Sequence, residues 1–204
     1  MGRSDVTAVT ITADTVALDA NGISTVAAVA DDAALVLNGA LASGGSVTLS
    51  HGRIVTILSS ADDSAISFTV VGTDVNGAAQ TESITGADTG TATGAAYFLT
   101  ISSITAVGDP AANVTAGVNA SAADVIFAGR ARLKGIYLTS TGTAGTIDFL
   151  NSSPVGTSVM KLSSVASATA TRDVVIPEEG VLFTAGMFIQ YTVSTFLTMT
   201  VFHA

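Results

Sequence analysis

The sequence contains no cysteine and no tryptophan, and it has few charged residues. Without cysteine the chain can form no disulfide, thiolate metal site or thiol nucleophile. Aromatic residues make up only 5% of the chain, so little material is present for the aromatic walls of a ligand or sugar site. Charged residues make up 11% and the net charge is -9, so nucleic acid is not an expected partner.

Long apolar runs are also missing, although 48% of the residues are hydrophobic and the mean hydropathy is +0.59. Ser, Thr, Gly or Asp interrupts every apolar run well before the roughly 20 residues that a membrane-spanning helix needs. Residues 1–5 contain one cation and precede an alternating stretch, so we expect no signal peptide. These features predict a protein that is made and folded in the cytoplasm, does not enter a membrane, and buries apolar surface against partners.

Alternation of apolar and polar residues predicts strands along most of the chain. The strand-like runs are residues 6–12, 54–58, 66–70, 80–84, 97–104, 114–118, 133–139, 146–150, 159–162, 173–176, 181–183, 188–193 and 197–202. Short strands at this spacing predict an all-β fold with two antiparallel β-sandwich or barrel-like domains. The one helical candidate, residues 23–37, contains β-branched residues that argue against a helix, and we interpret it as loop and short strand.

A domain boundary is expected near Asn119–Asp124, where the letters N-A-S-A-A-D interrupt the alternation. Residues 44–120 would then form a first sandwich and residues 121–204 a second sandwich or barrel. Residues 1–43 would form an extended N-terminal arm, or strands added to the first sandwich. The pair Asn76-Gly77 lies between strand-like runs and predicts a hairpin with a type I′ turn, which needs positive φ at both residues.

No group of residues has the spacing of a catalytic or metal site. His51, which we place at a turn, and His203 have no second histidine or carboxylate at ligand spacing, so a structural role is expected for both. Adjacent acids point to opposite faces of a strand or serve turns. This interpretation covers Asp31-Asp32, Asp62-Asp63 and Glu178-Glu179, the last in a β-turn with Pro177 at its first corner. We expect no enzyme activity, no cofactor and no metal.

Two segments are candidate interfaces. Arg130, Arg132 and Lys134 alternate, so on a strand all three would share a face. That row would bind an acidic partner or a neighbouring subunit, or it would protect an edge strand from aggregation. The second segment runs from Val6 to Thr12 and includes Val9 and Ile11, and its unpaired backbone could join subunits by strand addition.

Three patterns in the sequence are similar to those of a known class. Gly72–Glu82 has the form G-T-D-x-x-G-x-x-x-T-E, and the strand from Tyr97 has the form Y-F-x-T-I-x-S-I. Near the end of the chain, Gly180–Gly186 has the form G-[VI]-x-F-x-x-G. With these patterns the chain resembles virion structural proteins of tailed bacteriophages over about two-thirds of its length.

The resemblance implies a non-enzymatic virion protein, made in the host cytoplasm. We expect a capsid decoration or cement protein that binds the major capsid protein on the outer capsid surface and forms a homo-oligomer, with a trimer favoured. The alternatives are a tail, neck or fibre-attachment protein and, with less support because only three tyrosines are present, a host-glycan adhesion module. The resemblance carries no catalytic residue.

Overall fold

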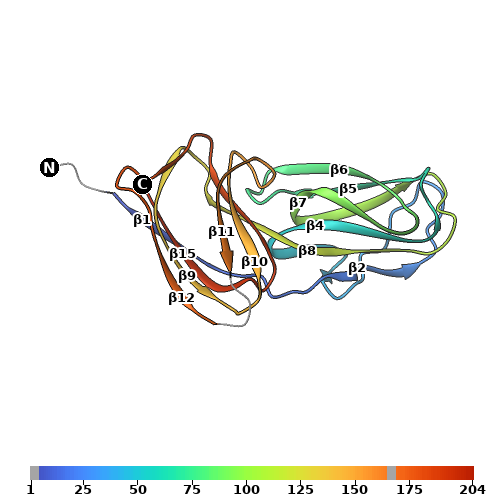
Figure 1. Cartoon of the computed structure of the whole chain (residues 1–204). Coiled ribbons are helices and arrows are strands. Elements are labelled where there is room, and N and C mark those ends of the chain that lie inside the picture. The colour runs from blue at the N-terminus through green and yellow to red at the C-terminus, as the bar shows by residue number, and fades with distance from the viewer. Residues whose placement is uncertain (1–4, 165–168) are drawn as a thin grey trace. The chain divides into compact units, whose positions relative to one another are not determined.

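The computed structural model describes residues 5–164 and 169–204, and within these ranges it contains strands but no α-helix (Figure 1). No helix among the described residues is therefore long and apolar enough to cross a membrane. Every strand pairs antiparallel with at least one neighbour. The prediction of an all-β, antiparallel, sandwich-like fold is confirmed.

The chain divides into two compact units. Unit 1 comprises the described residues of Met1–Val16 and Ser121–Ala204, and unit 2 is Ala17–Ala120. The structure thus divides the first 43 residues, which we expected to form one arm or to join the first sandwich alone. Residues 5–16 belong with the C-terminal half of the chain, and residues 17–43 belong with unit 2.

Unit 2 is a sandwich of long, bent strands. Its strands are β2 (Asp19–Ala27), β3 (Ala42–Ser43), β4 (Ser46–Asp62), β5 (Ser67–Thr73), β6 (Ala79–Thr85), β7 (Asp88–Val107) and the first half of β8 (Val114–Phe127). They follow the order β8-β4-β7-β5-β6, with β2 on β8 and β3 on β4.

Both ends of β7 lie at the same end of unit 2. At its start, Asp88 pairs with Asp62 of β4, and at its finish Val107 pairs with Ser67 of β5. The turn between β4 and β5 is short, since the N–H of Ile66 donates to the Asp63 carbonyl. The 20-residue strand must therefore fold back on itself, and shifts in register interrupt its pairing with β4 at three points.

The core of unit 2 consists of aliphatic residues and two phenylalanines. Seventeen buried side chains form one cluster, which includes Ile23, Val55, Ile57, Phe68, Phe98, Ile101 and Ile104. Val and Ile favour strands because their branched side chains pack well on a pleated surface. Most of the apolar residues in the alternating runs predicted from the sequence for this unit face this core.

Unit 1 is a sandwich of two sheets. The first, here called the terminal sheet, has the order β1-β15-β9-β12, with β13 beside β12 on β9. The second contains β11, β10, β14 and the second half of β8. The bounds are β1 (Thr7–Thr12), β9 (Ala131–Ser140), β10 (Gly145–Asn151), β11 (Thr157–Ser164), β12 (Thr171–Val175), β13 (Val181–Phe183), β14 (Met187–Thr192) and β15 (Phe196–His203).

Aromatic side chains join the two sheets of unit 1. The rings of Tyr191 on β14 and Phe196 on β15 have centroids 4.9 Å apart. Phe127 on β8 lies against His203 on β15, with centroids 5.1 Å apart. Tilted rings at these distances are a favourable arrangement, so the contacts stabilise the face-to-face packing of the sheets.

The predicted boundary near Asn119–Asp124 lies where the two units divide, between Ala120 and Ser121. Two local predictions were wrong. Residues 119–124 do not interrupt the strand pattern, because β8 continues through them to Phe127. The Asn76-Gly77 hairpin exists, but only Gly77 has a positive φ, 80°, so the turn is not type I′. The Gly77 N–H donates to the carbonyl of Asp74, and the Asp74 carboxylate accepts the N–H groups of Asn76 and Ala78. This carboxylate holds the turn in the observed form.

Candidate interaction surfaces

The cationic row does not lie at a sheet edge. Arg130 is exposed in a bend before β9, whereas Arg132 and Lys134 are half-buried on β9 itself. Strand β9 is interior, with β15 on one side and β12 and β13 on the other. The alternative that these cations protect an edge strand is therefore wrong.

Two of the three cations bind backbone of their own unit. Arg132 Nη1 donates to the Glu179 carbonyl at 2.9 Å, and Lys134 Nζ donates to the Glu178 carbonyl at 2.9 Å. These carbonyls belong to the turn in which Gly180 N donates to the Pro177 carbonyl, so Pro177 is the first residue of the turn and not its first corner. The side chains hold this turn against β9. Their use by an acidic partner stays a prediction.

The second candidate interface, strand β1, has partly exposed side chains and one side without a neighbouring strand in its sheet. Val6 precedes β1 and is 44% exposed, Val9 is half-buried, and Ile11 is only 8% exposed. Ile11 packs within its own unit, and its side chain is not available to a partner. The segment is not an unpaired arm, because residues 7–12 pair with β15 along one side. The other side of β1 is the edge of the terminal sheet.

The terminal sheet exposes apolar side chains on its outer face. The pairing places Ala8, Phe202, Gly135 and Val175 in one row across four strands. Phe202 is 37% exposed and Val175 is 89% exposed. Tyr137, in the next row, is 48% exposed. Apolar side chains that point to one face of a sheet and stay exposed form an apolar patch, and such patches mark interaction sites. We call Tyr137, Val175 and Phe202 the outer patch.

Charge is distributed unevenly between the units. Unit 2 has one arginine and nine carboxylates, a net charge of -8, and its arginine, Arg53, is 1% exposed. The surface of unit 2 therefore carries negative charge only. Unit 1 has six cations and seven carboxylates, a net charge of -1.

Most of the acids of unit 2 gather at the end where β7 begins and finishes. Hydrogen bonds join the loops there, because Gly108 N donates to Asp32 Oδ1 and Ala111 N donates to Asp63 Oδ1. The exposed acids at this end of unit 2 are Asp31, Asp32, Asp62, Asp88 and Asp109. The predicted turn role holds for Asp62, whose Oδ1 accepts from the N–H and hydroxyl of Ser64. These bonds lower the pKa of Asp62.

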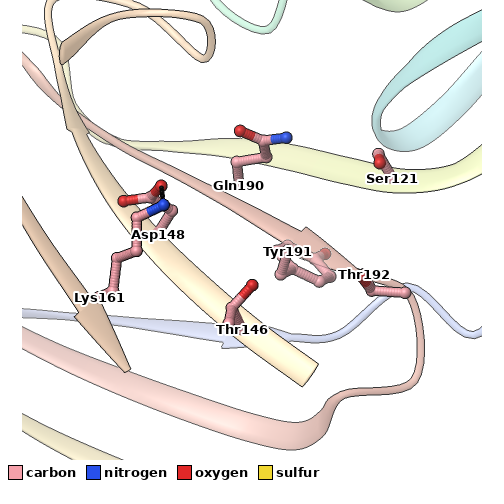
Figure 2. A pocket seen from close by; sticks show the side chains of 7 residues that line it. All are labelled: Ser121, Thr146, Asp148, Lys161, Gln190, Tyr191 and Thr192. Carbon is pink, nitrogen blue, oxygen red and sulfur yellow. Dashed lines mark ion pairs between the residues drawn. The ribbon is translucent and has the colours of Figure 1, made fainter. Parts of the chain in front are cut away.

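A polar hollow of about 180 Å³ lies on the second sheet of unit 1 (Figure 2). It is lined by Ser121, Thr146, Asp148, Lys161, Gln190, Tyr191 and Thr192. Lys161 Nζ lies 2.9 Å from Asp148 Oδ2, and Ser158 Oγ donates to Asp148 Oδ1 at 2.6 Å. Ligand pockets usually enclose about 300–1,000 Å³, so this hollow has room only for a few waters or a small polar group.

Tyr191 links three segments beneath the hollow. Its hydroxyl donates to Asp124 Oδ2 at 3.1 Å and accepts from the Asp14 N–H at 3.2 Å. Burial, with the charge of Asp124 as a smaller cause, raises the pKa of the Tyr191 phenol, so this side chain stays neutral. The phenol therefore serves as a fixed hydrogen-bonding group at neutral pH.

The histidines are not brought together. His203 is 5% exposed inside unit 1, whereas His51 lies in β4 of unit 2, within an irregular stretch of its pairing and not at a turn. Among the described residues, no group of three His, Asp or Glu side chains is arranged to hold a metal ion.

Sequence reasoning missed Arg53. It is the largest fully buried side chain among the described residues, and its Nη2 donates to the carbonyl of Asn119. The neighbouring residues Gly52 and Ile54 give no sign of a buried cation, because the alternation of β4 is interrupted there.

Comparisons of the chain with protein-family models, with curated proteins and with solved structures found no match. The resemblance to phage virion proteins therefore stays a prediction.

Proposed function

We propose that this protein is a non-enzymatic structural subunit of a tailed-bacteriophage virion. In this proposal it is a decoration or cement protein that is made in the host cytoplasm and binds the major capsid protein on the outer capsid surface. The sequence patterns around Gly72, Tyr97 and Gly180 support the class. The outer patch of the terminal sheet supports the binding role.

The outer patch is the observation on which the proposal depends. Of the thirteen large apolar side chains that are exposed in the described residues, nine belong to unit 1, and Val175 is the most exposed of them. Such side chains gain free energy when another protein covers them, at about 25 cal/mol per Å² of apolar surface. Unit 1, whose net charge is close to zero, is therefore the unit that we assign to the capsid contact.

Unit 2 has the surface of a part that stays in solvent. Its net charge of -8 with no exposed cation repels nucleic acid and other acidic surfaces. Negative charge also favours solubility. Unit 2 would keep decorated particles apart from one another while unit 1 holds the shell.

Cement action would follow from many modest contacts. A decoration protein that bridges neighbouring capsid subunits binds the assembled shell and not the separated subunits, so it stabilises the shell by mass action. Copies repeated over a symmetric shell multiply this effect. Particles with the protein should therefore release their DNA at a higher temperature than particles without it.

The test uses shells assembled from the major capsid protein of the same phage, mixed with the purified protein and sedimented. We expect binding by the wild type and its loss in Val175→Asp, which places a charge in the outer patch. Val36→Asp is the matched control, since Val36 is 66% exposed on unit 2. Equal binding by both variants would contradict the assignment of the outer patch. No binding by the wild type would contradict the capsid role.

Copy number separates the capsid role from a place in the tail or neck. Quantitative mass spectrometry of purified virions should find hundreds of copies of a shell protein. A dozen or fewer copies would instead favour the tail, neck or fibre-attachment alternative. The glycan-adhesion alternative would require reproducible binding to a glycan array.

A further inference from the structure

In the described parts of the chain, β1 is the one edge strand of five residues or more that has no charged residue. Among edge strands of five residues or more in the described parts of the chain, the others all carry charge: Asp19 in β2, Glu82 in β6, Lys161 in β11, and Arg172 and Asp173 in β12. Charges on an edge strand oppose pairing with another chain. β1 has the sequence T-A-V-T-I-T and lacks this protection.

The outward backbone groups of β1 can be identified from its pairing. The Ala13 N–H donates to the Leu197 carbonyl, so the backbone groups of residue 13 face β15. Alternate residues of an antiparallel strand direct their N–H and C=O groups to opposite sides, and the register is uninterrupted from residue 7 to residue 12. The groups of Ala8, Thr10 and Thr12 therefore point away from the sheet.

We propose that two copies of this chain pair antiparallel through β1, about a two-fold axis that passes beside Thr10. In this register Thr10 of one copy lies opposite Thr10 of the other copy. Ala8 of each copy lies opposite Thr12 of the other. All three residues with outward backbone groups are then used. On the inner face, Val9 lies opposite Ile11 of the other copy, so the apolar layer continues across the junction.

The register with the axis shifted by one residue toward the N-terminus, to Val9, fits less well. An axis at Val9 would use Ala8 and Thr10 but would need Val6, which lies outside β1, to pair with Thr12. It would also place Thr7 opposite Ile11 on the inner face. The Thr10 register instead places threonine opposite threonine, a pairing that the sheet already contains, since Thr10 Oγ1 lies 2.9 Å from Thr200 Oγ1 on β15.

Charge favours a second β1 as the occupant. If β12 paired with its own copy in the same way, an axis at Arg172 would place Arg172 against Arg172, and an axis at Asp173 would place Asp173 against Asp173. Like charges directly opposite each other destabilise a strand pair. β1 meets no such penalty with itself.

This inference does not rest on the proposed virion role. A two-fold pair is a dimer in solution, so it competes with the trimer that we expected from the sequence. A mass measurement separates the two states, because the chain has a mass of 20.2 kDa.

The first experiment measures the mass of the purified full chain by light scattering after size exclusion. We expect a dimer for the wild type and a monomer for Thr10→Lys and Thr10→Glu, because each places like charges opposite each other. An equimolar mixture of the two variants should restore a dimer through the Lys–Glu pair. Thr171→Lys on the other edge of the same sheet is the control, and it should stay a dimer. Circular dichroism establishes that each variant keeps its strands.

The second experiment uses the wild type alone and measures amide hydrogen exchange by NMR. The N–H groups of Ala8, Thr10 and Thr12 should be protected, and dilution to the monomer should release them while Val9 and Ile11 stay protected. A wild type that is monomeric or trimeric at every concentration would overturn the proposal. So would a Thr10→Lys variant that remains dimeric, a dimer that Thr171→Lys abolishes, or unprotected amides at Ala8, Thr10 and Thr12 in a dimer.

Discussion

Tyr191 and Asp124 are joined by a hydrogen bond of 3.1 Å between the phenol and Oδ2, at a point where three segments of unit 1 meet. The same hydroxyl accepts the N–H of Asp14, whose own carboxylate accepts the N–H of Val16. One side chain on β14 thus holds β8 and the segment that follows β1.

Tyr191→Phe should lower the free energy of unfolding by about 1–3 kcal/mol, because the Asp14 N–H and the Asp124 carboxylate each lose a buried partner. Chemical denaturation measures this value. Tyr137→Phe is the matched control, since its ring is 48% exposed, and it should change stability by less than about 0.5 kcal/mol. Equal effects of the two variants would contradict a structural role for the Tyr191 hydroxyl.

The raised pKa of Tyr191 predicts loss of stability in alkali. The folded state holds the phenol neutral, so its contribution is complete below the unfolded pKa of about 10 and declines as pH rises through the folded value. Denaturation midpoints from pH 8 to 12 should therefore fall more steeply for the wild type than for Tyr191→Phe. Parallel curves would exclude this coupling.

Asp62 should titrate below its ordinary pKa, because Ser64 donates to its carboxylate with the hydroxyl and the N–H. A lowered folded pKa contributes stability above the unfolded value and loses it as pH falls through the folded one. Ser64→Ala removes the hydroxyl bond and should raise the Asp62 pKa, as measured by NMR titration of the carboxyl carbon. Ser83→Ala, an exposed serine on β6, should leave that pKa unchanged.

Gly72→Ala should destabilise unit 2 severely. A Cβ at this position would lie 1.9 Å from the carbonyl oxygen of Thr100 on the neighbouring strand, so backbone must move. We expect a loss of more than about 2 kcal/mol. Gly135→Ala is the control, because its Cβ would meet the Phe202 ring at an ordinary 3.6 Å, and it should be neutral or slightly stabilising. Thermal unfolding of both variants distinguishes close approach from a general cost of replacing glycine in a strand.

Arg53→Ala should lower the free energy of unfolding by about 3 kcal/mol, because it leaves a cavity and removes the donor to Asn119. Arg53→Met fills much of the volume, and it should cost about 1 kcal/mol less. Arg172→Ala, on an exposed position of β12, serves as the surface control. If Arg53→Ala behaved like Arg172→Ala, the buried guanidinium would have no structural role.

The strands that could be predicted from the sequence are those with a clean alternation of Val, Ile or Phe with polar residues. The expected run 181–183 has the same bounds as β13, and 133–139 lies within β9. Strand β2 could not be found this way, because Gly22, Ile23 and Ser24 are buried in succession and show no period of two. The second half of β8 begins with the small residues Ser121, Ala122 and Ala123, and its pairing with β14 makes it a strand.

The candidate surfaces were predictable only in part. The row of Arg130, Arg132 and Lys134 was visible, but the position of β9 inside its sheet depends on pairing with residues more than 30 positions away. The edge at β1 likewise depends on its pairing with β15 at the other end of the chain. The outer patch consists of residues from three strands, so it cannot be predicted from any single stretch of sequence.

The division of the chain has a consequence for how it can be rebuilt. Asp14 reaches Tyr191, and Tyr191 pairs with Ala122, so the chain leaves unit 1 and re-enters it at nearby points. Residues 17–120 are thus a cassette carried within a host sandwich. If a short glycine linker replaces residues 17–120, we expect unit 1 to fold and to form both of its sheets. Other domains could be inserted at the same position.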